Sequence, residues 1–472
     1  MTLRSRTTNA AIWQLLARGA DRGLRFVASL VLARILAPDD FGLLAATMMV
    51  AGIVETLAYL GIDQAVVQSS RAEEPRFLGA AFRVLVWRGA VLCVVTAALA
   101  PVASWYFDDA AMLGMVLIVA AMPLVAGFEN PWMFVERKQL RFKPIAIATI
   151  AGACAQVAVS VGGAWAGLGA KALALGFVAS AVATVAAGWI LRAKRLDLSR
   201  DPEAHAELRG FAQRAAGVPF LIMLSTSAPS LILGRISGLE VLGIFTLAQR
   251  LCSLPSEIAL PIFGTVLTPA YAGIKDDLDR VRRVWLRTLA GVSLLVMPIV
   301  SAVVVLDERL PRVLYGEKYA GVAGLVSVIA LIGLASSILA CSGAMLWGLG
   351  RPEIDRRTLV LRVILIAAVA PVAAWYGGAI AFAASLVLAM VVGLVYCTHV
   401  ARRLVSARRR DVLRAFVPGS LAGGAVLALS LVTRDALIAR GFDEAVQVGA
   451  VLSLAGVAML IVGLAIRRGS VG

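Results

Sequence analysis

The sequence predicts an all-α integral membrane protein with fourteen transmembrane helices. Of its 472 residues, 60% are hydrophobic and only 16% are charged, the mean hydropathy is +0.88, and long apolar runs recur along the chain. A helix needs about 20 residues to cross the roughly 30 Å hydrocarbon core of a bilayer. The runs lack the short alternating pattern of a membrane β-barrel, so helices are the expected spanning elements. No separate soluble domain fits in the remainder.

The predicted spans are apolar runs bounded by Pro, Gly or clusters of charge. They fall near 10–36, 41–62, 78–100, 110–130, 142–165, 171–191, 214–236, 241–266, 285–306, 322–348, 358–376, 378–399, 412–432 and 444–466. The opening of the chain lacks the short apolar core and cleavage site of a secretory signal, so we expect the first span to stay in the mature protein.

The basic residues predict the topology. Connections after even-numbered spans are rich in Lys and Arg, whereas the alternate connections are poor in them and include acidic pairs at 39–40 and 108–109. The basic connections carry Arg137, Lys138, Arg141, Lys143, Arg192, Lys194, Arg195, Arg280, Arg282, Arg283, Arg402, Arg403, Arg408, Arg409 and Arg410. The positive-inside rule then places these connections and both termini in the cytoplasm. It explains most of the formal net charge of +16 without a nucleic-acid partner.

An internal repeat relates two distant segments. The stretch 29–45, SLVLARILAPDDFGLLA, aligns without a gap with the stretch 230–246, SLILGRISGLEVLGIFT. Chance similarity between two apolar segments is the alternative, but Ser, Arg, an acid and Gly recur at fixed offsets. Six spans separate the copies, so both copies enter the membrane in the same orientation.

The repeat predicts the domain organisation. Two six-helix lobes, 1–200 and 201–400, are expected to be related by a pseudo-two-fold axis along the membrane normal. The remaining residues, 401–472, form an additional terminal helix pair.

The first span carries charges that do not suit lipid. Gln14, Arg18, Asp21, Arg22 and Arg25 follow the spacing of one helix face. An arginine at the centre of an inserted helix costs about 2.5 to 3.5 kcal/mol, whereas each Leu or Val returns only about 0.3 to 0.6 kcal/mol. We therefore expect this face to line a polar cavity.

The alternative for this segment is an amphipathic helix over residues 3–25 that lies flat at the interface. Residues 26–36 alone would then have to cross the membrane. They would rise only about 16 Å, which is too short.

Further charged residues lie within predicted spans. Glu55 lies in the second span, Arg83 and Arg88 lie in the third, and Arg250 lies in the eighth. For Arg83 and Arg88, snorkelling to cytoplasmic headgroups is an equally good explanation. The five cysteines are scattered singly, and the two histidines lie in polar connections, so neither a metal site nor a cofactor is expected.

Converging arginines suit a phosphate or diphosphate group, because the planar guanidinium offers forked donors and stays charged in a dry site. Asp21 and Glu55 either hold these arginines when the site is empty or bind a coupling ion such as H⁺ or Na⁺.

Two stretches resemble a known family. VLARILAPDDFGLLA at 31–45, which leads into a span ending LAYLGIDQAVVQ, resembles the opening of bacterial polysaccharide flippases of the multidrug/oligosaccharidyl-lipid/polysaccharide superfamily. FTLAQRLCSLPSEIALPIFGTVLTPAYAGIKDD at 245–277 resembles the corresponding part of their second lobe.

The resemblance implies an alternating-access flippase, not an enzyme, in the bacterial inner membrane. Its implied substrate is an undecaprenyl-diphosphate-linked oligosaccharide that moves from the cytoplasmic to the periplasmic leaflet for surface polysaccharide synthesis. Membrane lipids, a polysaccharide polymerase and a chain-length regulator are implied partners. Arg18, Arg22 and Arg25 occupy places comparable to diphosphate-binding arginines of related flippases, and the terminal helix pair resembles their lipid-tail groove.

Two other functions stay open. A multidrug or cation antiporter of the same fold would favour acids and aromatic residues in its cavity, whereas most of the basic residues within spans lie in the first lobe. A membrane polysaccharide polymerase or ligase needs a sizeable external loop, and the longest predicted external stretch, 307–321, is short.

Overall fold

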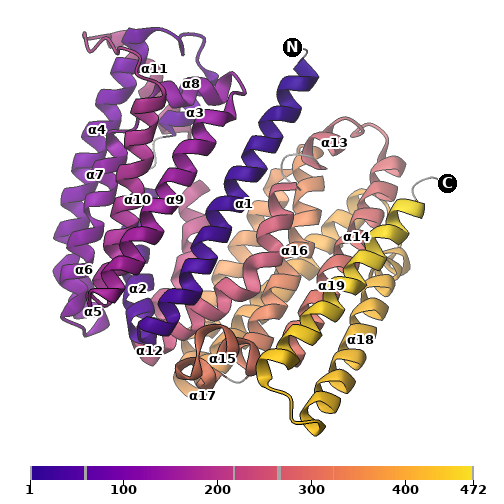
Figure 1. Cartoon of the computed structure of the whole chain (residues 1–472). Coiled ribbons are helices and arrows are strands. Elements are labelled where there is room, and N and C mark those ends of the chain that lie inside the picture. The colour runs from indigo at the N-terminus through magenta and orange to yellow at the C-terminus, as the bar shows by residue number, and fades with distance from the viewer. Residues whose placement is uncertain (1–2, 58–60, 216–217, 263–266, 323, 470–472) are drawn as a thin grey trace. The chain divides into compact units, whose positions relative to one another are not determined.

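The computed structural model describes residues 3–57, 61–215, 218–262, 267–322 and 324–469, and every regular element in these ranges is a helix (Figure 1). The predicted all-helical class is thereby confirmed. The chain divides into two compact units, Met1–Gly243 and Ile244–Gly472, and each is described by itself.

Unit 1 holds the helices of the first half of the chain. They are α1 Leu3–Ile35, α2 Pro38–Leu57, α3 Ile62–Gln68, α4 Pro75–Ala98, α5 Ala100–Phe107, α6 Ala111–Val119, α7 Ala121–Gly127, α8 Trp132–Lys138, α9 Phe142–Trp165, α10 Ala170–Leu191, α11 Pro202–Ala215 and the first part of α12 Val218–Ile262.

Unit 2 holds the rest of α12 and the later helices. They are α13 Thr268–Ala272, α14 Leu278–Val305, α15 Arg309–Tyr315, the 3-10 helix η2 Glu317–Val322, α16 Leu325–Gly348, α17 Pro352–Leu404, α18 Arg409–Ala439 and α19 Glu444–Gly469.

The described residues contain eight helices long and apolar enough to cross a membrane, and nine if the pair Ala111–Gly127 and Trp132–Lys138, bent by 67°, counts as one span. The chain is therefore a multi-pass membrane protein. Each of the fourteen predicted ranges overlaps a helix. Four of those ranges extend into residues outside the described part of the chain, at 58–60, 216–217, 263–266 and 323.

Two glycines divide the longest helices. As a straight rod, the 53 residues of α17 would measure about 80 Å, more than twice the thickness of the hydrocarbon core. Gly378 breaks it with φ 61° and ψ −155°, and Gly238 breaks α12 with φ 87° and ψ 168°. Glycine adopts this positive φ without a Cβ clash. Both breaks lie at or beside predicted boundaries between spans.

The two copies of the repeat touch each other. A Cβ on Gly42 would overlap the carbonyl oxygen of Leu239, and a Cβ on its counterpart Gly243 would overlap the carbonyl oxygen of Pro38. Pro38 and Leu239 are themselves counterparts in the repeat. The contact is reciprocal, as at a two-fold interface, and only glycine permits such a close approach of the two backbones.

One end of unit 1 is held together by short helices. Buried residues of α3, α4, α8 and α11 form a hydrophobic cluster there, and Figure 1 shows α3, α8 and α11 gathered at one end of the bundle. Its fully buried members include Phe77 and Val66. This end carries the basic connections of unit 1, including Arg137 and Arg192.

A buried ion pair ties α8 to the end of α10 at the same place. Arg192 Nε lies 2.8 Å from Glu136 Oε1, and Arg192 Nη2 donates to Glu136 Oε2 at 2.8 Å. Only 5% of the Glu136 side chain is exposed. Asn130 Nδ2 donates to the Arg192 carbonyl oxygen at 2.8 Å. Both the side chain and the backbone of Arg192 are therefore held in place.

In unit 2, α18 packs closely on α14. Gly419 and Gly423 are four residues apart on one face of α18, and Cβ atoms there would come within 2.5 Å and 3.1 Å of α14 atoms of Ser293 and Met297. This small-residue spacing lets membrane helices approach closely. The terminal pair is thus anchored through glycines on α18.

Candidate functional site

The five predicted site residues of the first span all lie on α1. Arg18 and Arg22 are exposed, whereas Gln14, Asp21 and Arg25 are half-buried. The Asp21 carboxylate accepts a hydrogen bond from Arg25 Nε at 2.7 Å, four residues along the helix. Asp21 thus contacts Arg25 along the same helix.

Arg25 is also held by the neighbouring helix α10. Its Nη2 donates to Ser180 Oγ at 3.3 Å, and its guanidinium lies 5.9 Å from the centre of the Phe177 ring. Three contacts thus position Arg25, one with Asp21 of α1 and two with residues of α10.

Between Arg18 and Val31, the exposed sides of α1 differ in polarity. Val27 and Val31 are 58% and 39% exposed, and each follows an exposed arginine, Arg18 or Arg22, by nine residues. Nine residues make two and a half turns, so valines and arginines lie on opposite sides of the helix. Exposed valines are compatible with lipid, whereas a side that carries arginines is not suited to it.

The helix α1 runs unbroken from Leu3 to Ile35 (Figure 1). Its 33 residues correspond to about 50 Å, more than the hydrocarbon thickness. The alternative of a flat segment over 3–25 followed by a separate crossing segment needs a break near residue 25, which α1 does not have. Ala17 and Ala28 are buried on α1, which packs along α9.

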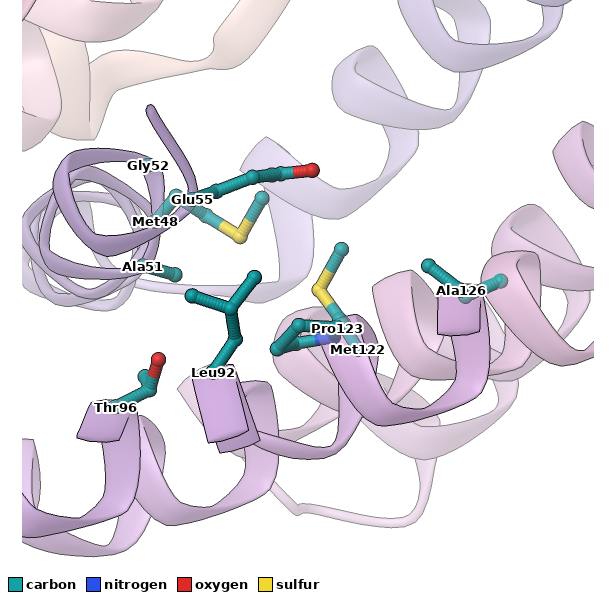
Figure 2. A pocket seen from close by; sticks show the side chains of 10 residues that line it. Met48, Ala51, Gly52, Glu55, Leu92, Thr96, Met122, Pro123 and Ala126 are labelled. Carbon is teal, nitrogen blue, oxygen red and sulfur yellow. The ribbon is translucent and has the colours of Figure 1, made fainter. Parts of the chain in front are cut away.

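Glu55 lines a cavity of about 180 Å³ within unit 1. Figure 2 shows Glu55 and Met48 of α2 facing Leu92 of α4 and Met122 of α7 across this cavity. The lining is mostly apolar, and Glu55 is the one carboxylate among the described residues that form it. Ala181, next to the Ser180 that binds Arg25, also lines it.

Arg88 lies beside a second cavity, of about 190 Å³. Its Nη2 donates to the Glu55 carbonyl oxygen at 3.3 Å, and it lines this cavity together with Asp63, Glu129 and Arg137. Arg137 and Asp63 form an ion pair at 3.2 Å. The sequence alone predicts a cytoplasmic connection for Arg137 and no role for Asp63, because neither residue belongs to the periodic pattern of a span.

Arg83 is engaged with the segment between α10 and α11. Its Nη1 and Nη2 donate to the carbonyl oxygens of Leu198 and Ser199, both at 2.9 Å. Arg83 thus contacts a connecting segment, whereas Arg25 contacts α10 and Arg88 contacts the backbone of α2.

Arg250 lies on the part of α12 in unit 2, where it is half-buried.

Carboxylates order this same connecting segment. Asp201 caps α11 by accepting from the Ala204 N–H at 2.9 Å, and it accepts from Arg71 Nη2 at 2.7 Å. The backbone hydrogen bond and then the Arg71 bond hold the pKa of Asp201 below its usual range. Among the residues that the structure describes, no three His, Cys, Asp or Glu side chains form a metal-binding group.

Comparison with known proteins identifies the family. Residues 31–324, more than half of the chain, match the family described as polysaccharide biosynthesis protein. The lipopolysaccharide biosynthesis protein WzxC of Escherichia coli is 25% identical over 422 residues, which cover 89% of this chain and 86% of WzxC. The succinoglycan biosynthesis transport protein ExoT of Rhizobium meliloti is 23% identical, over 68% of this chain and 64% of ExoT.

Solved structures show the same fold. The lipid II flippase MurJ in an inward closed conformation aligns with a TM-score of 0.74 at 10% identity, over 98% of this chain and all of MurJ. A multidrug resistance MATE transporter of the MOP superfamily aligns with a TM-score of 0.63 at 15% identity, over 84% of this chain and 98% of that structure. The family match, the sequence relatives and the common fold agree, and this chain belongs to the polysaccharide biosynthesis protein family.

Proposed function

We propose that this protein is a flippase that moves a polyprenyl-diphosphate-linked oligosaccharide from the cytoplasmic to the periplasmic leaflet by alternating access. One observation carries the proposal: Arg18 and Arg22 are exposed on the side of α1 opposite its exposed valines. Such a side is suited to a hydrated cavity and to an anionic lipid headgroup. The names of the relatives, which concern polysaccharide biosynthesis and transport, support a transporter rather than an enzyme.

The sugar needs a wet path, because each unsatisfied polar group in hydrocarbon costs several kcal/mol. In the proposed mechanism, Arg18, Arg22 and Arg25 hold the diphosphate, Asp21 and Gln14 support them, and the polyprenyl tail stays in lipid or in a groove of the terminal pair. Glu55, Arg88 and Arg250 contribute to the polar surface that the sugar meets.

The membrane potential can drive this export. Two negative charges that leave a negative cytoplasm gain roughly 4 to 5 kcal/mol per 100 mV, at about 2.3 kcal/mol for each charge. ATP is then not needed. A coupling ion, H⁺ or Na⁺, would bind at Asp21 or at Glu55, whose cavity holds one carboxylate.

The finer architecture is part of the same proposal. It has fourteen spans, lobes over 1–200 and 201–400 related by a pseudo-two-fold axis, and a terminal pair over 401–472. The reciprocal contact of Gly42 and Gly243 supports the two-fold relation. Both termini are proposed to lie in the cytoplasm of a bacterium whose inner membrane holds the protein, where a polymerase and a chain-length regulator act on its product.

Single substitutions test the diphosphate role. Arg18→Ala, Arg22→Ala and Arg25→Ala are compared with Arg195→Ala, which removes an exposed arginine of a connection. A hydrogen bond to a charged group is worth about 1.5 to 3 kcal/mol, so each stripe variant should lower surface polysaccharide roughly 10-fold to 100-fold. Arg22→Lys should restore only part of it, because an ammonium lacks the forked donors. Full export by all three Ala variants at normal protein levels would eliminate the role.

Cysteine labelling tests the topology. A cysteine in place of Asp108 should react with an impermeant reagent in intact cells, and one in place of Arg409 only after permeabilisation, both in a chain without its native cysteines. The reverse result would invert the proposed orientation.

A further inference from the structure

An open cavity of about 680 Å³ lies on the surface of unit 1, between α4 and the beginning of α11. Figure 1 shows α11 beside one end of α4. The cavity is lined by Arg83, Val84, Trp87, Arg200, Pro202 and His205. It thus combines two guanidinium groups, an imidazole and an indole.

The charge of this cavity is cationic. Within the described residues, Arg83 donates to two backbone carbonyl oxygens, and its Nη2 lies 3.5 Å from His205 Nε2. Arg200 is exposed and makes no ion pair within the part of the chain that the structure describes. The acids of this segment are engaged elsewhere: Asp197 pairs with Arg76 at 2.9 Å, and Asp201 pairs with Arg71 at 2.7 Å. The cavity therefore holds positive charge, and none of the described carboxylates forms an ion pair with it.

An apolar stripe leads away from the cavity along α4. Trp87 is 73% exposed, and Val91 and Val94 follow it at four and seven residues and are 41% and 68% exposed. This spacing keeps the three side chains on one face of the helix, and in a membrane span such an exposed apolar face contacts acyl chains. Arg83 is one turn before Trp87, so the cationic cavity lies where the apolar stripe ends. Tryptophan is enriched at this depth, where the headgroups meet the chains.

We propose that this cavity binds the phosphate headgroup of an anionic phospholipid of the surrounding membrane, whose acyl chains lie along Trp87, Val91 and Val94. Arg83 and Arg200 bind the phosphate oxygens, since guanidinium groups donate to phosphate in a forked geometry. The site serves a resident lipid and is separate from the proposed diphosphate site on α1. A lipid bound there would join α4 to the segment between α10 and α11, because Arg83 belongs to α4 and donates to the carbonyl oxygens of Leu198 and Ser199 in that segment.

The test uses the full chain purified in detergent and native mass spectrometry with dioleoylphosphatidylglycerol or dioleoylphosphatidylcholine as the probe. Arg200→Gln removes a cavity charge without breaking the bonds of Arg83, and Arg209→Gln is the matched control, an exposed arginine of α11 that does not line the cavity. We expect phosphatidylglycerol to bind in preference to phosphatidylcholine. We also expect Arg200→Gln to weaken phosphatidylglycerol binding about fivefold, because one arginine near an anionic lipid surface contributes about that factor to the affinity. Arg209→Gln should leave the affinity unchanged. Trp87→Ala should weaken both lipids.

Three results would overturn the proposal. Equal binding of the two lipids would remove the role of charge, and equal behaviour of Arg200→Gln and Arg209→Gln would remove the role of the cavity. Competition by millimolar inorganic phosphate would indicate a site for free phosphate instead. Surface polysaccharide export separates this site from transport: if Arg200→Gln lowers export as strongly as Arg22→Ala is expected to, the cavity belongs to the transported lipid.

Discussion

The glycine contact between the two repeat copies leads to a quantitative prediction for Gly42→Ala and Gly243→Ala. A methyl group on Gly42 would overlap the Leu239 carbonyl oxygen and come to 3.0 Å from Gly243 N, and one on Gly243 would overlap the Pro38 carbonyl oxygen and lie 2.8 Å from Gly42 N. Both obstacles are backbone atoms, which cannot rotate aside. The helices must therefore separate by about 1.5 Å to restore an ordinary contact of about 3.3 to 3.6 Å between carbon and oxygen.

The two opposing energies can be compared. Overpacking of this kind costs about 1 to 3 kcal/mol, while alanine is favoured over glycine in a helix by about 1 kcal/mol. Since rigid backbone faces rigid backbone, we expect the upper half of the overpacking range. Each single variant should then lose about 1 to 2 kcal/mol of unfolding free energy.

The double variant distinguishes this explanation from a general loss of stability. The same separation of α2 from α12 accommodates both methyl groups, so Gly42→Ala and Gly243→Ala together should cost clearly less than the sum of the two single changes. Reversible unfolding of the purified chain in mixed micelles, followed by circular dichroism, measures these free energies. Gly114→Ala is the control, because a Cβ there meets nothing within 4 Å.

Two outcomes would refute the reasoning. If both single variants are as stable as Gly114→Ala, the backbones do not touch as described. If the double variant costs the full sum, the two glycines do not share one interface.

Three further predictions concern particular contacts. Glu136→Leu should cost about 1.5 to 3 kcal/mol because it removes the charged partner of Arg192, whose side chain is 30% exposed. Glu136→Leu with Arg192→Leu should recover part of that loss in the same unfolding assay; an unchanged single variant would contradict a structural role for the pair. Gly419→Leu should separate α18 from α14 and cost about 1 to 3 kcal/mol, whereas Gly424→Leu, where a Cβ would meet nothing within 4 Å, should be tolerated; equal losses would argue against the close packing. Because the pKa of Asp201 is lowered in the folded chain, its contribution to stability is present at neutral pH and is lost as the pH falls through the folded pKa, below about 3.8. Asp201→Ala should thus lower the unfolding temperature at pH 7 and have no such effect at the lowest pH at which the chain stays folded; a difference that persists there would contradict the ionic explanation.

Much of the fold could be predicted from local pattern. Apolar runs predicted the helices, and clusters of charge or glycine predicted their ends, including the breaks at Gly238 and Gly378. Periodicity also predicted that Arg18, Arg22 and Arg25 lie on one helix face. These properties depend on residues within a few turns of each other, so hydropathy and spacing are sufficient to predict them.

The candidate site could be predicted only in part. The polar face of α1, which Gln14, Arg18, Asp21, Arg22 and Arg25 form, repeats with the period of a helix, and Glu55 is a carboxylate inside an apolar run. Both features can therefore be recognised in the sequence. Asp63 has neither property, and its ion pair with Arg137 joins residues 74 positions apart. Arg83 likewise shows its partners only after the chain has folded, because Leu198 and Ser199 belong to a segment more than a hundred residues later.

The sequence by itself determined that this chain crosses a membrane many times, that it carries a repeat, and that its first helix holds arginines which lipid rejects. The tertiary structure alone decided that Arg25 donates to Ser180, that the backbones meet at Gly42 and Gly243, and that Arg18, Arg22, Val27 and Val31 of α1 are exposed. The physical reason is that transfer from water to lipid is a property of each segment, whereas a contact between helices depends on which segments pack together and on how closely their backbones approach.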